Sequence, residues 1–352
     1  MSDFRSDTVT QPTAAMKQAM MDAPLGDDVF GDDPTVIRLQ ETAAAMLGFE
    51  AGLFAPSGTQ TNLIALMTHC QRGDEAIVGQ QWHTYRWEAG GMAVLGSIQP
   101  QPLDHLPDGT IPLAAIEAAI KPDDPHFAKT RLVAMENTTG GKVLPLAYMQ
   151  EVSALAKRRG LRAHIDGARL FNAAVALAEQ DGSDPVSKAR EICNGYDSVS
   201  LCLSKGLGAP VGSVLLGSKE FIQQARRVRK MLGGGMRQAG VLAAAGLHAL
   251  EHHVRRLAED HANARALAEG LARTCATHPK LEGKVTVHPV QTNILFIDVD
   301  ESVADAFLQH LAAQGVKVTS GVYGSAKRIR WVTHLNVGQE DVARALKVVA
   351  AF

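Results

Sequence analysis

Residues 198–206 read SVSLCLSKG, an apolar run that ends in a serine, a lysine and a glycine. Such a run is typical of a buried strand. A lysine is rarely buried without a partner, and Gly206 and Gly208 allow the backbone to turn sharply or to approach a ligand closely. Partly desolvated at the end of a strand, Lys205 would be a competent imine-forming amine. The alternative interpretation is a surface lysine at a strand end.

On both sides of this run, short apolar segments alternate with segments of helical periodicity. This pattern is typical of an α/β fold, in which a mostly parallel sheet is covered by helices. The expected strands are 52–55, 76–78, 131–136, 161–166, 198–203, 212–216, 291–298 and 328–332. The expected helices are 34–48, 60–70, 145–159, 167–178, 218–231, 301–314 and 338–350.

The chain is longer than one hydrophobic core usually supports, because it has 352 residues. Its composition, with 46% hydrophobic and 20% charged residues, is that of a compact globular protein. A helical, Ala/Leu-rich stretch over 238–273 is expected to connect two parts. We therefore expect a large domain over 1–250, with an N-terminal segment able to pack against a small α+β domain over 251–352.

The charge and cysteine patterns restrict the compartment and the partners. Thirty-five basic and 37 acidic side chains nearly cancel, which argues against nucleic acid or an anionic membrane as a partner. The four cysteines are far apart, so neither a disulfide framework nor a metal site is expected. The first twelve residues show no apolar signal core, and no apolar run approaches the ~20 residues of a membrane span. We expect a cytoplasmic protein.

Two charged residues follow the apolar strand of the segment AHIDGAR at 163–169. Asp166 closes the strand, where α/β sheets bind ligands. Its side chain would either cap the next helix or pair with a protonated pyridine nitrogen and keep that ring an electron sink. Arg169 could face the same crevice and bind a carboxylate through two hydrogen bonds, or it could be a surface arginine of the helix.

A third feature is the segment PSGTQTN at 56–62, between an expected strand and an expected helix. Its small residues leave backbone N–H groups accessible at a helix N-terminus, which suits a phosphate. Taken alone, the segment is indistinguishable from an ordinary turn. Together with Lys205 and Asp166 it provides what pyridoxal phosphate (PLP) needs, namely an imine-forming lysine, a partner for the ring nitrogen and a phosphate anchor.

Several longer motifs resemble those of the threonine aldolase family, in its L-directed low-specificity or allo-type branch. The resemblance extends from Arg5 to about Val337. It implies fold type I of the PLP enzymes, with an aspartate aminotransferase-like large domain and a mixed, mostly parallel sheet. The motifs are RSDTVTQPT (5–13), GDDVFGDDPT (26–35), FAPSGTQTN (54–62), HIDGARLFNA (164–173), CLSKGLGAPVGS (202–213) and RKMLGGGMRQAG (229–240).

The resemblance assigns roles to the residues that contact the cofactor. It implies that Lys205 forms the imine with PLP and that Asp166 pairs with the pyridine nitrogen. It also implies that His83 stacks on the pyridine ring and is a candidate base, although a lone histidine beside an apolar segment is more often structural. The residues expected at the phosphate are Ser57, Gly58 and Thr59.

The resemblance also implies how the substrate is held. Ser6, Arg169 and Arg330 are expected to bind its carboxylate, with Arg330 on a C-terminal strand that would cover the site. His126 is a second candidate for contact with the β-hydroxyl group, and a loop histidine otherwise. The remaining residues expected near the substrate are Phe30, which stands where family members often carry a tyrosine, and Trp87.

The glycine-rich segment KMLGGGMR at 230–237 is unusual for a helix end. By resemblance, Arg237 and Lys230 reach across a subunit interface toward the cofactor of a neighbouring chain. This implies at least an obligate dimer, and the resemblance favours a homotetramer built as a dimer of dimers. A further departure from the family, Thr139-Gly140 in place of a common His-Asn pair, is expected to alter the preference for the substrate's β-substituent.

The expected reaction is cleavage of L-threonine or L-allo-threonine, or of other β-hydroxy-α-amino acids, to glycine and an aldehyde. PLP would stabilise the charge left on the glycine part, and a base would take the hydroxyl proton. The main alternative is another PLP activity of the same fold, namely a β-lyase, a racemase or an aminotransferase. A scaffold protein without catalysis is disfavoured by the presence of Lys205, Asp166, His83 and Arg330. An NAD enzyme is disfavoured because no Gly-x-Gly-x-x-Gly follows an early strand.

Overall fold

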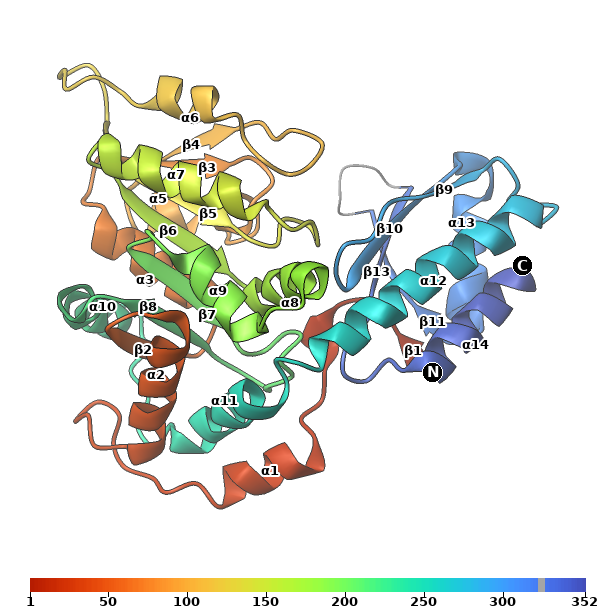
Figure 1. Cartoon of the computed structure of the whole chain (residues 1–352), viewed down its shortest axis with the longest axis horizontal. Coiled ribbons are helices and arrows are strands. Elements are labelled where there is room, and N and C mark those ends of the chain that lie inside the picture. Colours follow the sequence, from red (N-terminus) through yellow and green to blue (C-terminus); the bar gives the residue numbers. More distant parts are fainter. Residues whose placement is uncertain (322–326) are drawn as a thin grey trace.

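A seven-stranded sheet forms the centre of the larger of two lobes (Figure 1). The computed structural model describes residues 1–321 and 327–352. Strand β8 runs antiparallel to β2 and β7, whereas the other neighbouring pairs are parallel. This confirms the predicted mixed, mostly parallel sheet. In spatial order the strands are β2 (Ala51–Ala55), β8 (Ser213–Gly217), β7 (Ser198–Cys202), β6 (Arg162–Gly167), β5 (Lys129–Glu136), β3 (Asp74–Gly79) and β4 (Gln99–Leu103).

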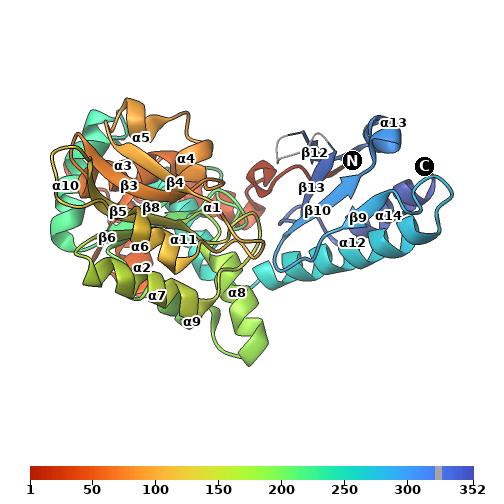
Figure 2. The ribbon, with the colours of Figure 1, turned by 90° about the horizontal axis from the view of Figure 1, so that it is seen from above.

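Helices cover both faces of this sheet (Figure 2). Leu132 and Ala134 of β5 pack with one group of buried residues, and Val133 and Met135 pack with another. Successive residues of a strand point to opposite faces, so a strand buried on both sides has a continuous apolar sequence. The helices of this lobe are α1 (Ala14–Met21), α2 (Pro34–Leu47), α3 (Gly58–His69), α4 (His83–Arg86), α5 (Gly91–Val94), α6 (Leu113–Ala119), α7 (Leu146–Arg158), α8 (Leu170–Asp181), α9 (Pro185–Cys193), α10 (Lys219–Met231) and α11 (Gly240–His252).

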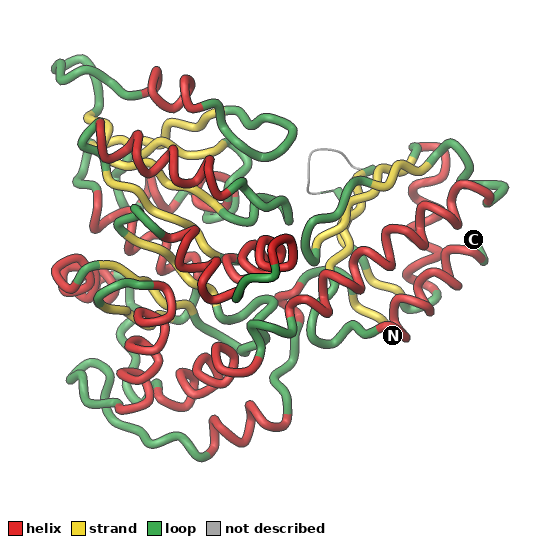
Figure 3. The backbone as a smooth tube through the Cα atoms, in the orientation of Figure 1, coloured by secondary structure: helices red, strands yellow, loops and turns green. Residues whose placement is uncertain are grey.

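The smaller lobe contains a four-stranded antiparallel sheet with helices packed beside it (Figure 3), and it has its own core. Phe307, Trp331 and Val349 are fully buried in this core. Its strands are β12 (Thr319–Ser320), β13 (Arg328–Val332), β10 (Ile294–Val299) and β9 (Val285–Val287), and its helices are α12 (Leu257–Thr277), α13 (Glu301–Ala313) and α14 (Gln339–Ala350).

The N-terminus belongs to the core of the smaller lobe. Strand β1 (Ser2–Asp3) pairs with β11 (Val316–Lys317), and Phe4 packs edge-on against Trp331 with ring centroids 5.4 Å apart. The helical stretch expected over 238–273 is two helices, α11 and α12, separated at 253–256. We propose the division at residue 250 for the domains, since the two cores form separate clusters.

Candidate active site

The candidate site lies where the parallel strands β5, β6 and β7 end. Glu136 and Asp166 are register partners at the ends of β5 and β6. Lys205 is half-buried and follows β7 after three residues. The carboxyl ends of parallel strands lie at the same edge of a sheet, which is where open α/β sheets bind ligands. The topology therefore brings together a lysine and two carboxylates that are far apart in the sequence.

Asp166 is 2% exposed and has two hydrogen-bond donors. Its Oδ2 accepts from Asn62 Nδ2 at 2.9 Å, and its Oδ1 accepts from the backbone N–H of Ala168 at 3.0 Å. A buried carboxylate is costly unless it is hydrogen-bonded. The second contact comes from the turn that begins α8, so Asp166 is held both by its own strand end and by α3.

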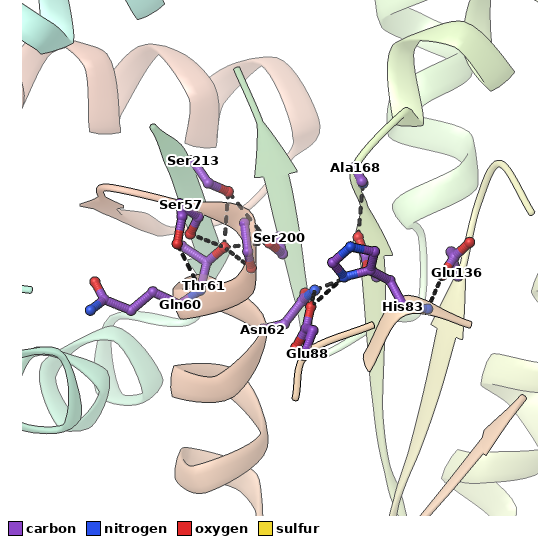
Figure 4. A network of polar contacts seen from close by, with 12 residues as sticks. Ser57, Gln60, Thr61, Asn62, His83, Glu88, Glu136, Ala168, Ser200 and Ser213 are labelled. Atoms are coloured by element: carbon purple, nitrogen blue, oxygen red, sulfur yellow. Dashed lines mark hydrogen bonds and ion pairs between the residues drawn. The ribbon is translucent and has the colours of Figure 1, made fainter. Parts of the chain in front are cut away.

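His83 forms the second part of the cluster (Figure 4). Its Nδ1 lies 2.8 Å from Glu88 Oε1. One ring nitrogen of His83 and one carboxylate oxygen each of Glu88 and Asp166 lie within 4.8 Å of one another. Burial would lower the pKa of His83, but the hydrogen bond to Glu88 and the charge of Asp166 raise it above its ordinary value. Burial in turn raises the pKa of Glu88. The imidazole is therefore suited to accept a proton.

Glu136 completes the cluster from β5. Its Oε2 accepts a hydrogen bond from the backbone N–H of His83, which fixes the start of α4. Burial and the nearby Asp166 carboxylate raise the pKa of Glu136 to about 8. Near neutral pH this residue is therefore largely protonated, and the cluster avoids three adjacent negative charges.

The start of α3 provides the expected phosphate anchor. Ser57 is the N-cap of this helix, and its Oγ accepts from Gln60 N at 3.1 Å. The first N–H groups of a helix have no acceptor within the helix, which leaves those of Gly58 and Thr59 available to an anion. Behind this turn, Thr61 hydrogen-bonds to Ser200 and to Ser213, which join α3 to β7 and β8 (Figure 4).

The glycine-rich segment 230–237 lies beside the same helix start within this chain. Gln60 Nε2 donates to Leu232 O at 3.2 Å, and a Cβ on Gly234 would lie 2.1 Å from Gln60 Oε1. Arg237 is half-exposed and pairs with Asp27 at 3.0 Å, while Lys230 is exposed. The glycine-rich segment is therefore beside the phosphate anchor through Leu232 and Gly234, and the expected contact of Arg237 and Lys230 across a subunit interface stays a prediction.

The N-terminal segment 5–10 joins the residues expected to bind the substrate carboxylate. Asp7 accepts from Arg169 Nη2 at 2.6 Å and from Arg169 Nε at 2.7 Å. Burial alone would raise the pKa of Asp7, but the Arg169 guanidinium holds it well below its usual range. Arg330 Nη2 donates to Arg5 O at 2.8 Å, and Thr10 Oγ1 donates to Lys205 O at 3.4 Å. Ser6 lies between these contacts.

His126 and Phe30 are exposed within one chain, whereas Trp87 is bound to the cluster through its backbone, since Trp87 N donates to His83 O at 2.9 Å. The side chain of His126 is 85% exposed, pairs with Asp124 and precedes β5, at the end of the strand opposite to Glu136. Phe30 is 80% exposed in the loop before α2. Trp87 is 38% exposed, under the guanidinium of Arg86.

Four residues of the site have no role in the sequence-based prediction. These are Asn62 and Asp7, which lie inside quoted motifs, and Glu88 and Glu136, which do not; the sequence neighbours of all four do not reveal their partners. The sequence does indicate that a buried aspartate at a strand end needs hydrogen-bond donors. It does not point to Asn62, which is 104 positions away.

The fold and this strand-end cluster define a PLP-dependent enzyme of fold type I. A model of the beta-eliminating lyase family matches residues 3–302. The low specificity L-threonine aldolase of Escherichia coli (strain K12) is 50% identical over 352 residues, covering 100% of this chain and 99% of that protein. The low-specificity L-threonine aldolase 1 of Arabidopsis thaliana is 46% identical, covering 97% and 93%. The chain therefore belongs to the beta-eliminating lyase family, within its group of low-specificity L-threonine aldolases.

Solved structures agree with this fold. A threonine aldolase from Leishmania major matches with a TM-score of 0.82 at 21% identity, covering 100% of this chain and 99% of that one. A serine palmitoyltransferase from Sphingomonas wittichii matches with a TM-score of 0.74 at 20% identity, covering 99% and 86%. These likenesses confirm the expected fold type, and the relatives confirm the expected family and its PLP cofactor.

The residues present fit PLP. The Lys205 ammonium is close enough to Asp7, His83 and Glu136 to interact with each of them electrostatically. A protonated ring nitrogen would have the buried carboxylate of Asp166 as its oppositely charged partner. The helix start at Ser57 offers the complementary anion site. The amine of Lys205, the carboxylate of Asp166 and the anion site at Ser57 thus lie along one edge of the sheet.

Proposed function

We propose that this chain cleaves L-threonine, L-allo-threonine and other β-hydroxy-α-amino acids between the α- and β-carbons, giving glycine and an aldehyde. The observation that carries the proposal is the cluster of Lys205, Asp166 and His83 in a chain that is half identical to a curated low specificity L-threonine aldolase. Family membership supports the reaction class, and the cluster supports the chemistry.

The cofactor residues have separate tasks. When bound, PLP accepts the electron pair released at the substrate's α-carbon. Lys205 would hold the cofactor covalently, and Asp166 would keep a proton on the ring nitrogen through a buried ion pair. The N–H groups at the start of α3, from Gly58 and Thr59, would bind the phosphate together with Ser57. Arg237 and Lys230 of a neighbouring chain would add positive charge there.

His83 is the proposed base for the β-hydroxyl proton. In its neutral form, Nδ1–H donates to Glu88, so Nε2 carries the lone pair that can accept a proton. Glu88 therefore fixes both the orientation and the tautomer of the ring. The raised pKa of His83 favours transfer of the hydroxyl proton to it.

The substrate carboxylate is proposed to bind between the two lobes. Arg169 comes from the turn before α8, and Arg330 from β13 of the smaller lobe. Both contact the segment that contains Ser6. Orientation of the carboxylate decides which bond of the α-carbon is broken, and that is a positioning effect.

We propose a homotetramer, a dimer of dimers, with the active site at a subunit interface. His126 lies at the opposite end of β5 from Glu136, so its contact with a β-hydroxyl group requires a second copy of the chain. Phe30, in the loop before α2, and Met231, at the end of α10, are 80% and 71% exposed, which suits an apolar contact. Light scattering of the purified protein would give the assembly mass, and a monomer would contradict the proposal.

A cytoplasmic location is also proposed. All four cysteines are free and buried, which suits a reducing compartment. Among the described residues, no helix is long and apolar enough to cross a membrane.

The function is tested by adding L-allo-threonine to the PLP-loaded protein and measuring acetaldehyde with a coupled dehydrogenase. We expect acetaldehyde and glycine in equal amounts, and a Lys205→Ala variant that loses both the cofactor absorption band and the activity. A cofactor band without acetaldehyde would favour a β-lyase, racemase or aminotransferase. Absence of the band after incubation with PLP would overturn the assignment.

A further inference from the structure

A row of four polar side chains, three buried and one (His69) half-buried, lies between α3 and strands β6 and β7 beside Asp166. Asn62 Oδ1 lies 3.3 Å from His164 Nε2, His164 Nδ1 lies 2.8 Å from Ser198 Oγ, and Ser198 Oγ lies 2.7 Å from His69 Nε2. His164 and Ser198 are fully buried, and Asn62 is 1% exposed. The proposed mechanism assigns no role to either histidine. Buried polar groups in such a row must satisfy one another.

The active-site end fixes the orientation of the Asn62 amide. Asn62 Nδ2 lies 2.9 Å from Asp166 Oδ2 and 2.9 Å from Glu88 Oε1. Carboxylate oxygens accept hydrogen bonds, and the amide NH2 group has two hydrogens to donate. The amide oxygen of Asn62 therefore faces His164 and has to receive a hydrogen from it.

This orientation fixes every later donor in the row. Burial lowers the pKa of His164 and of His69 to about 3, so both rings are neutral and each carries one hydrogen. His164 carries it on Nε2 to serve Asn62, so Nδ1 accepts from the Ser198 hydroxyl. The opposite tautomer, with Nδ1–H donating to the Ser198 backbone carbonyl, would leave the Asn62 oxygen without a donor. The Ser198 oxygen then accepts from His69 Nε2–H. All hydrogens point from His69 toward the two carboxylates.

We propose that His164 is a positioning residue for the cofactor-binding Asp166 and for the base His83, acting through Asn62. Its Nε2–H holds the Asn62 amide so that the NH2 group stabilises the ionised Asp166 and keeps Glu88 an acceptor for His83. The inference rests on the roles proposed for Asp166 and His83. Without this donor, the amide could turn its oxygen toward two carboxylates, and the cofactor partner would lose its only side-chain donor among the contacts described for it.

The tautomers provide the first test. In the full-length holoenzyme labelled with 15N-histidine, NMR should show His164 and His69 as neutral Nε2–H tautomers at neutral pH. The two signals are assigned by their loss in His164→Gln and His69→Gln variants. An Nδ1–H tautomer or an imidazolium at His164 would overturn the proposal, because Asn62 would then have the opposite orientation.

A matched pair of variants separates the two nitrogens of His164. In a glutamine at this position, the amide NH2 group occupies the position of the imidazole Nε2. In an asparagine, the amide NH2 group occupies the position of Nδ1. His164→Gln therefore keeps the donor to Asn62, and His164→Asn keeps only the side toward Ser198. We expect His164→Gln to bind PLP within about threefold of the parent, and His164→Asn to bind it about tenfold more weakly, the loss of a hydrogen bond that supports a charged group.

PLP affinity is measured by titrating the full-length chain after removal of the cofactor, without substrate, so failure of threonine cleavage would not affect the result. His261→Phe is the control, since His261 is a buried histidine of α12 outside the row. We expect its PLP affinity to match the parent. Equal affinities of the glutamine and asparagine variants would refute the role of Nε2–H.

Discussion

At the scale of single residues, the site depends on how buried charges are compensated. Asp166, Glu88 and Glu136 lie close together, and each is stabilised differently: Asp166 by amide donors, Glu88 by His83 and Glu136 by holding its proton. A second pair, Asp7 and Arg169, is nearly enclosed, with side chains 0% and 14% exposed. Removing one member of such a pair leaves an uncompensated buried charge.

The Asp7→Asn variant should therefore lose about 3 kcal/mol of unfolding free energy, measured by denaturant unfolding. Its Michaelis constant should also rise, because Arg169 loses the partner that orients it. Asp3→Asn is the matched control, since Asp3 and Arg5 form an exposed ion pair, worth only about 0–1 kcal/mol. Equal losses in the two variants would show that the Asp7 pair contributes no more than a surface pair.

Glu136 gives a prediction for pH dependence. Its pKa is about 8 in the folded chain and 4.5 ordinarily, so between these values the folded chain binds more protons than the unfolded one. Its contribution to stability therefore falls as pH rises through this window. Glu136→Gln should flatten that fall in the cofactor-free protein by at least about 1 kcal/mol, the value of a one-unit shift. Parallel stability curves for parent and variant between pH 5 and 8 would contradict it.

The sequence predicted the site residues that stand at a recognisable place in a motif. It did not predict the residues that belong to the site only through contacts with distant parts of the chain. Lys205 and Asp166 follow apolar runs, so strand ends could be recognised. Asn62 and Glu88 are defined by distances to residues far away in the chain, and local patterns carry no such information.

At the scale of elements, periodicity predicted the long helices and the buried strands, because these bury continuous or regularly spaced apolar faces. The two-residue strands β1, β11 and β12 have no periodicity to detect, and they form because the fold of the smaller lobe places their partners beside them. The helical stretch at 238–273 suggested one connecting element, but its break at 253–256 has no Gly or Pro to signal it.

The loop after β5 shows how elements of the two lobes join. Thr292 Oγ1 donates to Gly141 O at 2.7 Å, and Val143 N donates to Gln291 Oε1 at 2.6 Å. This docks the strand that carries Glu136 onto the start of β10. A Cβ at Gly141 would lie 2.7 Å from Ile294 Cβ, whereas one at Gly140 would meet nothing within 4 Å.

Gly140 and Gly141 both have positive φ, so replacement of either by alanine should cost about 1–2 kcal/mol for the backbone. Gly141→Ala should lose about 1–3 kcal/mol more, because the added methyl group overpacks the lobe contact. Denaturant unfolding measures the stability lost by each variant. The difference between the two losses gives the part that is due to the lobe contact, because both variants share the backbone strain. If both variants lose the same stability, the loop does not dock tightly on β10.

At the scale of the whole molecule, the N-terminal segment couples the two lobes through the site. Phe4 is fully buried in the smaller lobe, and Val332 N donates to Phe4 O at 2.8 Å. The next residues contact Arg330 through Arg5 O, and Arg169 through Asp7. The placement of the smaller lobe thus decides where both proposed carboxylate-binding arginines lie.

This coupling predicts that Phe4→Leu changes catalysis as well as stability. Phe307→Leu is the control, because Phe307 is fully buried in the same core but lies on α13 against Phe352, in the part of the lobe that carries no residue assigned to the site. Both variants should lose stability, by less than the about 3–5 kcal/mol typical of Phe→Ala. Phe4→Leu alone should raise the Michaelis constant for L-allo-threonine by several-fold, since Ser6 and both arginines lose their common support, while Phe307→Leu leaves it unchanged. Steady-state kinetics at a temperature where both variants are folded makes the comparison. If the Michaelis constants rise together, the core acts on the site only through general loosening, and the N-terminal segment is no specific link.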